Sequence, residues 1–356
     1  MPKFHSLKVR DLRRETSECV SVSFEVPTEL LPEFHFLPGQ HLTLKTTVGG
    51  NEIRRSYSIC SAPNNGEIRV AIKQVAGGQF SAFANGTLAI GDLLDVMTPM
   101  GNFTLETALE NTKHYVAFAA GSGITPIMAM MKAVLKEEPK SHFTLFYGNR
   151  TTDSIIFRDE IEDLKNEYLT RLSVHHVLSQ EDLGADLFFG RIDAAKCQQF
   201  CTKVLDVMDV DAFFLCGPEP MIFAVKDTLA ALGVDERNIH FELFTTPGEM
   251  AKNAVKWKPV NAAIASKITL TLDGKTYQYD HNQAAETILD AASKTVADLP
   301  YACKGGVCCT CKAKVLKGEV EMEVCYGLEK EEVEAGYVLT CQAHPKTEQV
   351  VLSFDE

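Results

Sequence analysis

Residues 303–311 read Cys303-Lys304-Gly305-Gly306-Val307-Cys308-Cys309-Thr310-Cys311, and Cys341 follows after 29 further residues. Two cysteines separated by four residues, a third after two more and a distant fourth form the ligand spacing of plant-type [2Fe–2S] clusters. The glycines allow a tight loop whose backbone N–H groups turn towards the sulfurs. We therefore predict an iron–sulfur centre held by four thiolates: Cys303, Cys308, Cys311 and Cys341.

Other uses of these cysteines stay open at this point. A structural zinc site is one, although zinc commonly takes two pairs of closely spaced ligands, and the single Cys341 fits that pattern poorly. Cys309 lies beside Cys308 and could compete with it as a ligand, but the spacing favours Cys308. Neither spacing requires Cys325. Four more cysteines are interpreted as small buried side chains: Cys19, Cys60, Cys197 and Cys201.

The bulk composition indicates a soluble protein of several domains. Its 356 residues exceed one ordinary core, and we expect three domains. The net charge of −13 disfavours nucleic acid and an anionic membrane surface as partners, and no apolar run is long enough to span a bilayer. The N-terminus lacks the layout of a secretory signal, so we expect a cytoplasmic protein, whose eleven cysteines serve metal binding better than a disulfide framework.

The pattern of apolar and polar runs along the chain predicts two successive domains of different fold. Residues 1–107 carry short alternating runs separated by Gly, Pro and Asn, which is typical of an antiparallel barrel; the runs are 19–26, 41–47, 67–75 and 92–97. Residues 108–246 carry apolar strands alternating with helical stretches, which predicts a parallel α/β domain with helices on both faces. The expected strands are 114–120, 143–147, 172–178, 212–216 and 239–244.

A third domain is predicted after a linker. Residues 247–264 show no steady period and are interpreted as that linker, which leaves 265–356 as the last domain. In it, Lys267–Leu272 and Lys275–Tyr279 flank an Asp-Gly pair and predict a β-hairpin. A helix is expected from about Glu286, and the cysteine loop follows it.

A glycine-rich turn marks a candidate nucleotide site. The apolar run His114–Ala120 leads directly into Gly121-Ser122-Gly123-Ile124-Thr125-Pro126 and a methionine-rich helical stretch. Gly-x-Gly alone is a weak signal, but at a strand–helix junction its backbone N–H groups and the helix dipole can meet a pyrophosphate. We interpret the methionines of that stretch as core filling.

Two later strand ends should converge on the same turn. Cys216-Gly217-Pro218 ends one apolar strand, and His240-Phe241-Glu242-Leu243-Phe244 ends the next. In an open parallel sheet, ligands gather at the carboxyl ends of the strands, so we expect these residues near Gly121. The alternative for Cys216 is an inert core thiol, and the alternative for Phe244 is a plug beneath the linker.

Two stretches of the first domain suit a phosphorylated flat heterocycle. Arg54-Arg55-Ser56-Tyr57-Ser58 offers a cation, a ring and a hydroxyl along one strand, with Arg55 and Tyr57 on the same face. Gly77-Gly78-Gln79-Phe80-Ser81 offers a turn that can cradle phosphate with N–H groups and a hydroxyl. From composition alone, an exposed edge strand has the same appearance as the first stretch.

In this order, the motifs resemble the ferredoxin–NADP reductase superfamily fused to a C-terminal ferredoxin domain, over nearly the whole chain. The resemblance implies a multidomain α/β and β protein with an antiparallel flavin-binding β-barrel, a parallel α/β nucleotide-binding domain and a β-grasp [2Fe–2S] domain. More narrowly, four stretches look like the reductase components of bacterial phenylacetyl-CoA epoxidases: Phe4-His5-Ser6-Leu7, Arg54–Cys60, Leu299–Cys308 and Ala335–Gln342. The implied partner is the di-iron oxygenase of such a complex.

The resemblance also implies roles for matching residues. For FAD, the implied contacts are Arg55 to phosphate, Tyr57 to the ribityl chain and ring, Ser58 near the N5 edge, and Gly78 and Ser81 to the pyrophosphate. For the nicotinamide dinucleotide, the implied residues are Gly121, Gly123, Thr125, Pro126, Gly217 and Pro218. Close to the nicotinamide and flavin rings, the implied residues are Cys216, Phe244 and Glu242, the last assisting proton balance. In the family, alanine or serine is more common at the position of Cys309.

The resemblance favours NADPH over NADH. A 2′-phosphate needs a cation, and Arg150 stands at the end of a predicted strand, with Arg158 and Arg191 as further candidates. An arginine at a strand end is also commonly a solvated residue, so NADH stays open.

The predicted cofactors imply a converter from two-electron to one-electron transfer, because hydride arrives as a pair whereas an iron–sulfur cluster accepts single electrons. Together with this logic, the resemblance implies an NADPH-dependent flavin and iron–sulfur reductase of a phenylacetyl-CoA epoxidase. One alternative serves a Rieske-type dioxygenase or another monooxygenase with NADH. A second, from another class, is a non-catalytic redox sensor or scaffold, which the flavin and nucleotide motifs disfavour.

Overall fold

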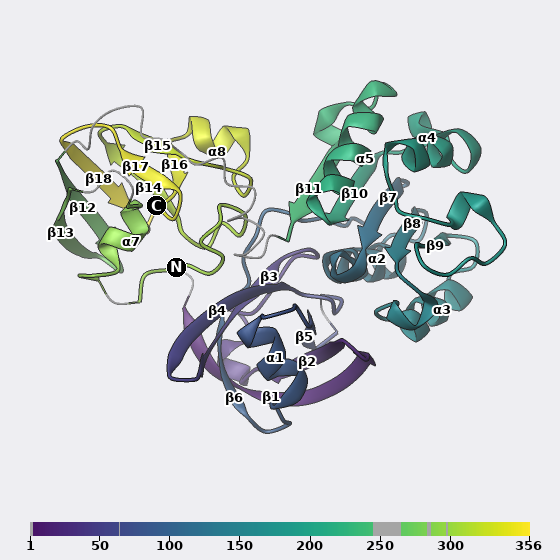
Figure 1. Cartoon of the computed structure of the whole chain (residues 1–356), viewed down its shortest axis with the longest axis horizontal. Helices are drawn as coiled ribbons and strands as arrows, with labels where there is room; N and C mark the ends of the chain where they lie inside the picture. Colours follow the sequence, from purple (N-terminus) through teal and green to yellow (C-terminus); the bar gives the residue numbers. More distant parts are fainter. Residues whose placement is uncertain (1–2, 64, 245–264, 283–285, 297) are drawn as a thin grey trace.

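The N-terminal part of the chain forms a six-stranded antiparallel sheet that curls into a half-barrel (Figure 1). The structure, a computed structural model, describes all residues except 1–2, 64, 245–264, 283–285 and 297. The strands are β1 (Phe4–Thr16), β2 (Cys19–Glu25), β3 (His41–Val48), β4 (Asn51–Ser58), β5 (Ile68–Lys73) and β6 (Leu93–Met97). They bond in the order β4-β3-β6-β1-β2-β5, and a bridge between Ile59 and Val70 links the two edges.

Alternating polarity explains why these segments are strands. In β1, Leu7 and Val9 are buried whereas Lys8 between them is exposed, as the two-residue period of a strand requires. Helix α1 (Gln79–Gly86) follows β5 and begins after Gly78. The turn expected at 77–81 is therefore the start of a helix.

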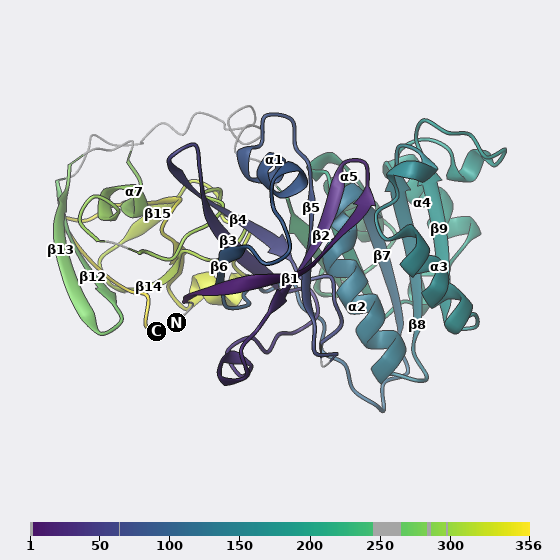
Figure 2. The same ribbon diagram turned by 90° about the horizontal axis from the view of Figure 1, so that it is seen from below.

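The middle of the chain forms a five-stranded parallel sheet with helices on both faces (Figures 1 and 2). Its strands are β7 (His114–Ala120), β8 (His142–Asn149), β9 (Leu172–Leu178), β10 (Ala212–Gly217) and β11 (Ile239–Leu243). Its helices are α2 (Ile124–Glu137), α3 (Arg158–Glu167), α4 (Ala194–Lys203) and α5 (Glu219–Ala231). The strand order is β11-β10-β7-β8-β9, so the winding direction reverses between β7 and β10. Ligands of such sheets bind beside that reversal, at the carboxyl ends of the strands.

The barrel and the parallel domain share one hydrophobic core. Cys60 and Phe103 of the barrel belong to the same buried cluster as Met128 and Met130 of α2, which fill the core as expected. Lys132 Nζ also donates to the Cys60 carbonyl oxygen over 3.1 Å. The two domains are thus packed together as one body. Cys19, Cys197 and Cys201 are buried as well, as expected.

The C-terminal domain is a mixed β-grasp sheet. Its strands are β12 (Ser266–Leu272), β13 (Lys275–His281), β14 (Lys312–Lys317), β16 (Tyr337–Leu339) and β18 (Gln349–Ser353), in the order β13-β12-β18-β14-β16. A small second sheet pairs β15 (Val320–Met322) with β17 (Ala343–Pro345), and the helices are α7 (Ile288–Ala292) and α8 (Lys330–Glu334). Asp273 and Gly274 have φ angles of 50° and 69°, as a two-residue hairpin turn requires.

The fold predicted from the sequence is confirmed in all three parts. The predicted strands occur within a few residues of their expected bounds, and the helix expected from about Glu286 begins at Ile288. The predicted linker 247–264 lies outside the described residues, so the domain boundaries stay predictions. Within the part of the chain that the structure describes, no helix combines the length and apolarity needed to cross a membrane.

We expect Gly123→Ala to destabilise the parallel domain. Gly123 lies at the start of α2 against the end of β10, where an added Cβ would overlap the Cys216 carbonyl oxygen and lie 2.8 Å from the Gly217 nitrogen. Overpacking against rigid backbone typically costs about 1–3 kcal/mol. Thermal unfolding followed by circular dichroism measures the loss. Gly86→Ala is the control, because no atom lies within 4 Å of its added Cβ, and an equal melting temperature for the two variants would contradict the expectation.

Candidate functional site

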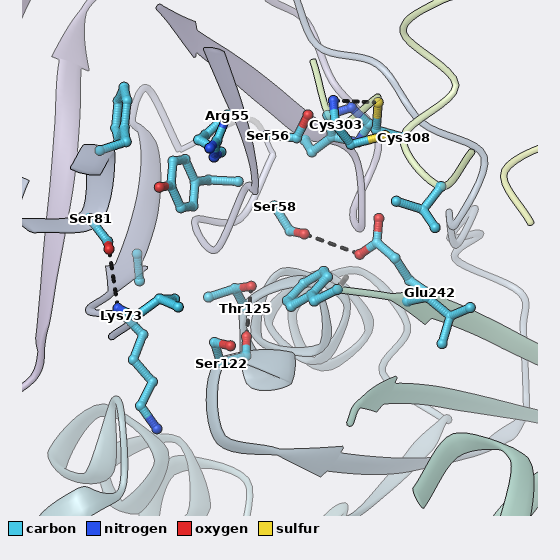
Figure 3. A pocket seen from close by; sticks show the side chains of 18 of the residues that line it. Arg55, Ser56, Ser58, Lys73, Ser81, Ser122, Thr125, Glu242, Cys303 and Cys308 are labelled. Carbon is cyan, nitrogen blue, oxygen red and sulfur yellow. Dashed lines mark hydrogen bonds between the residues drawn. The ribbon is translucent and has the colours of Figure 1, made fainter. Parts of the chain in front are cut away.

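One cavity lies where the three domains meet (Figure 3). The lining residues that the sequence analysis also selected are Arg55, Tyr57, Ser58, Gly78, Ser81, Thr125, Glu242, Phe244, Cys303 and Cys308. In Figure 3, Cys303 and Cys308 enter from one side and Ser122 and Thr125 from the other, with Ser58 between them. The fold therefore brings the three motif regions around one space.

Strand β4 forms the barrel wall of the cavity. Arg55 and Tyr57 both line it, and the Tyr57 ring packs against Phe80 of α1 with centroids 5.5 Å apart. Burial raises the pKa of the Tyr57 phenol, so the ring is neutral at physiological pH. Arg55 Nη1 donates to the Arg54 carbonyl oxygen over 2.7 Å. This wall offers one cation and one ring side by side.

The turn before α1 closes one end of this wall. The Ser81 hydroxyl accepts from the Val75 backbone N–H and donates to the Gly78 carbonyl oxygen, both over 3.1 Å. An added Cβ on Gly78 would lie 2.6 Å from Ser81 Oγ, so a residue without a side chain suits this position. The turn is held in place by its own hydroxyl, with the N-terminus of α1 directed at the cavity.

The nucleotide-type loop lies at the switch point of the parallel sheet. Gly121 has a φ of 54°, and its carbonyl oxygen accepts from the Tyr147 hydroxyl over 3.0 Å. Thr125 Oγ1 donates to the Ser122 carbonyl oxygen over 3.0 Å. Gly123 contacts the end of β10 at Cys216 and Gly217, so the first of the two predicted strand ends lies against the glycine-rich turn.

The remaining sequence-selected residues of the parallel domain differ in burial and in whether they line the cavity. Cys216 is fully buried and is not among the residues that line the cavity, whereas Phe244 lines it. Pro126 is buried in α2, and Pro218 is exposed at the start of α5. The candidate 2′-phosphate cations are all exposed and lie outside this cavity: Arg150, Arg158 and Arg191.

A hydrogen-bonded carboxyl connects the barrel to the parallel domain. The Ser58 hydroxyl donates to Glu242 Oε2 over 3.1 Å. Burial raises the pKa of Glu242 to about 8, although the bond from Ser58 opposes that shift. Glu242 therefore holds a proton at neutral pH, at the point where β4 meets the end of β11.

The cysteine loop brings four thiols together. The Cys303 thiol interacts electrostatically with the Cys308 and Cys341 thiols, and the Cys341 thiol interacts with that of Cys311. The Gly305 N–H donates to Cys303 Sγ over 3.2 Å, and the Cys303 N–H donates to Cys308 Sγ over 3.5 Å. Such N–H bonds stabilise thiolate ligands. The loop thus fits a two-iron cluster, which needs two thiolates for each iron.

Cys309 points to a different partner. Its thiol donates to the Gly327 carbonyl oxygen, and its φ of 55° turns it out of the register of Cys308. An added Cβ on Gly327 would lie 2.9 Å from Cys309 Sγ, which shows how closely the two residues pack. The Cys309 thiol thus has a backbone partner of its own, and the choice of Cys308 over Cys309 as a ligand stays a prediction.

Two cavity residues were missed by the sequence analysis. His41 is only 3% exposed, burial lowers its pKa to about 4, and its Nε2 has no hydrogen-bond partner among the described residues. Lys73 ends β5, lines the cavity and lies 3.6 Å from a Cβ added to Gly121. An unpaired buried imidazole nitrogen and a cation fit a polar, anionic ligand such as a flavin nucleotide. Neither residue belongs to a recognisable motif.

Comparison with known proteins decides the family. An oxidoreductase FAD-binding domain profile matches residues 6–105, an oxidoreductase NAD-binding domain profile matches 118–227, and a 2Fe-2S iron-sulfur cluster binding domain profile matches 270–346. The chain is 46% identical to a component of the 1,2-phenylacetyl-CoA epoxidase of Escherichia coli (strain K12), covering 100% of this chain and 99% of that protein. The chain belongs to the FAD- and [2Fe–2S]-containing oxygenase reductases.

More distant relatives have the same organisation. The ferredoxin reductase component of the 3-ketosteroid-9-alpha-monooxygenase of Rhodococcus rhodochrous is 32% identical, over 98% of this chain and 96% of that protein. The solved structure of phthalate dioxygenase reductase superposes with a TM-score of 0.57 at 21% identity, covering 99% and 98% of the two chains. That likeness shows the fold, with its barrel, parallel domain and C-terminal iron–sulfur domain.

Family membership makes the chain an NAD(P)H-dependent electron-transfer oxidoreductase rather than a non-catalytic sensor or scaffold. It also selects a [2Fe–2S] centre over structural zinc for the C-terminal domain. When bound, flavin accepts a hydride as an electron pair and releases electrons singly to the cluster. The residues that line the cavity would position these groups, and Glu242, one of them, holds a proton there.

We expect Glu242→Gln to flatten the pH dependence of stability. The pKa of Glu242 is raised from 4.5 to about 8, so its contribution to folding is fully present below about pH 4.5 and is lost as pH rises through 8. The groups that interact with this carboxyl include Ser58, Cys216 and Cys309. The wild-type melting temperature should therefore fall relative to that of Glu242→Gln as pH is raised through that interval.

Melting temperatures of the FAD-loaded proteins across this pH range provide the measurement. Glu236→Gln is the control, because that exposed glutamate precedes the same strand and pairs only loosely with Lys226, at 3.8 Å. Parallel profiles of melting temperature against pH for wild type and Glu242→Gln would contradict the raised pKa of Glu242.

Proposed function

We propose that the chain passes electrons from NADPH, through FAD and a [2Fe–2S] cluster, to the di-iron oxygenase of a phenylacetyl-CoA epoxidase. One observation carries the electron path: the flavin-type strand, the nucleotide-type loop and Cys303 with Cys308 all line the same cavity. The oxygenase partner rests on the 46% identical relative, which is named as part of a phenylacetyl-CoA epoxidase. Placement alone would then suffice for transfer, because neither step needs bond-making by the protein.

FAD would lie along β4. Arg55 would contact its phosphate, Tyr57 the ribityl chain and ring, and Ser58 the ring edge near N5. Gly78 and Ser81 would hold the pyrophosphate with the turn described above, aided by the nearby Lys73 cation. This assignment is supported by the shared cavity and by the buried His41 nitrogen, which has no partner among the described residues.

The nicotinamide dinucleotide would lie at the switch point of the parallel sheet. Its proposed contacts are Gly121, Gly123, Thr125, Pro126, Gly217 and Pro218. Cys216 and Phe244 would lie near the nicotinamide and flavin rings. Phe244 lines the cavity, whereas Cys216 is buried near the end of β10. Arg150 is the proposed 2′-phosphate partner and the basis for preferring NADPH; its exposure at the end of β8 leaves it accessible to a charged group.

The cluster would be held by Cys303, Cys308, Cys311 and Cys341. Their thiols converge, and the backbone N–H groups of Cys303 and Gly305 turn towards sulfur. Because two of these cysteines line the cavity, the cluster would lie beside the flavin and inside the protein.

A second candidate partner is the oxygenase of another monooxygenase system. The 32% identical relative serves a 3-ketosteroid monooxygenase, and a 30% identical relative from Pseudomonas aeruginosa is a glycine betaine monooxygenase reductase subunit. The same domain order therefore serves several oxygenases, and only the partner protein distinguishes them.

We expect Cys308→Ala to separate the two halves of the electron path. The variant should retain reduction of ferricyanide by NADPH, which flavin alone supports, and lose reduction of cytochrome c, which needs the cluster. Cys309→Ser is the matched control, because serine can still donate to the Gly327 carbonyl oxygen; it should retain both activities and the cluster spectrum. Cytochrome c reduction by Cys308→Ala at the wild-type rate would contradict the assignment of Cys308 as a cluster ligand.

Reconstitution with oxygenase components tests the partner and the nucleotide. The purified reductase, with its flavin identified after extraction, is combined with the phenylacetyl-CoA epoxidase oxygenase or with a steroid monooxygenase oxygenase. We expect NADPH-coupled formation of the ring epoxide with the first only, and a higher kcat/KM for NADPH than for NADH. Turnover with the steroid oxygenase alone would assign the second function, and a preference for NADH would overturn the role of Arg150.

A further inference from the structure

A stack of alternating cations and aromatic rings crosses from the barrel to the iron–sulfur domain. Lys45 Nζ lies 4.5 Å from the Phe4 ring centre, and the Arg54 guanidinium lies 5.2 Å from that same ring. The Arg54 guanidinium also lies 4.3 Å from the Tyr301 ring centre, and Lys304 Nζ lies 4.9 Å from the centre of that ring. Arg54, on β4, is therefore the central member of a stack that ends inside the cysteine loop.

Hydrogen bonds add to this stack at Arg54. Its Nη1 donates to the Leu299 carbonyl oxygen over 2.9 Å, and its Nε donates to Glu52 Oε1 over 2.8 Å. Asp298 lies 3.9 Å from Nη2. The Arg54 side chain is only 6% exposed and its bond to the Leu299 carbonyl oxygen is buried, whereas the Glu52 and Asp298 side chains are 46% and 83% exposed. A buried guanidinium that is both stacked and hydrogen-bonded needs a planar fork, which lysine cannot provide.

The contacts of Arg54 fall on the segment that leads into the cluster. Leu299 and Tyr301 precede Cys303 by four and two residues, and Lys304 follows it directly. The next residue along β4 is Arg55, which lines the cavity. Strand β4 thus presents Arg55 to the cavity, while Arg54 contacts the segment that precedes the cysteine loop. In Figures 1 and 2, β4 lies on the side of the barrel nearest the iron–sulfur domain.

A second polar contact between these domains is weaker. Asn102 Nδ2 donates to Glu332 Oε2 over 2.7 Å, and it lies 3.4 Å from the Gly327 carbonyl oxygen. The bond to Glu332 is exposed to solvent, where polar pairs contribute little. Among the described residues, Arg54 is therefore the better shielded of the two polar contacts between the barrel and the iron–sulfur domain.

We propose that Arg54 is a positioning residue for electron transfer between the flavin and the cluster. By holding residues 298–301 against β4, it keeps Cys303 at the cavity and so keeps the cluster within reach of the flavin edge. Two successive steps would each move one electron from reduced flavin to oxidised cluster, and the proton that the flavin loses on reoxidation would pass to solvent; Arg54 would take no part in the chemistry and only hold the two sites in place. The inference rests on the proposed cluster ligands, whose failure would appear separately, as an intact cluster in Cys308→Ala.

The test is Arg54→Ala in the full-length protein carrying both cofactors. Anaerobic rapid mixing with NADPH follows flavin bleaching and then cluster reduction by freeze-quench paramagnetic resonance. We expect cluster reduction to slow by about tenfold or more, the effect of losing roughly 1.4 kcal/mol of docking free energy. Flavin bleaching, ferricyanide reduction and the resonance spectrum of the reduced cluster should stay as in wild type. Small-angle X-ray scattering should show a larger radius of gyration, which a purely local defect would not produce.

Three further variants sharpen the result. Arg54→Lys keeps the charge without the planar fork and should give an intermediate rate of cluster reduction. Tyr301→Leu removes the ring from the other side of the contact and should show the same split, with effects that do not add to those of Arg54→Ala. Arg13→Ala is the control, because that exposed barrel arginine pairs with Asp11 of its own strand and should behave as wild type.

Two outcomes would overturn the proposal. The first is cluster reduction at the wild-type rate in Arg54→Ala with an unchanged radius of gyration. The second is loss of the cluster on isolation of both Arg54→Ala and Tyr301→Leu, which would make Arg54 a folding residue of the iron–sulfur domain.

Discussion

Strand β4 is bonded to both neighbouring domains, and the cavity depends on that double contact. At one end of the strand, Ser58 donates to Glu242 of the parallel domain, and nearer its middle Arg54 donates to Leu299 of the iron–sulfur domain. Between them, Arg55 and Tyr57 face the cavity. A single extended segment can serve three neighbours because successive side chains of a strand point in different directions.

The charges around the cavity follow from burial. Glu242 is protonated at neutral pH and His41 is neutral, because burial disfavours the charged form of each side chain. Arg55 and Lys73 remain as cations that line the same space. The cavity therefore combines neutral polar groups with a small excess of positive charge, although the whole chain carries a net charge of −13. Local composition, not net charge, decides which ligand is bound.

Much of the fold and of the candidate site could be predicted from local patterns. The apolar runs of the parallel domain and the Asp273–Gly274 hairpin depend on residues close together in the chain, and both predictions matched the elements observed. The cysteine ligands, chosen by their spacing, stay a prediction. His41 and Lys73 could not be found in this way, because a single histidine or lysine in a strand has no distinguishing pattern. Arg54 was read only as part of a motif, and its partner Leu299 lies far away in the chain.

The sequence by itself determined the three domain types and the set of thiols suited to a cluster, because strand alternation, helical periodicity and ligand spacing are local properties. Only the tertiary structure decided that Arg54 donates to Leu299 in the segment before Cys303, that Cys309 bonds to Gly327, and that Glu242 carries a proton. These properties arise from distance and burial between segments remote in the chain, and they exist only after the domains have packed.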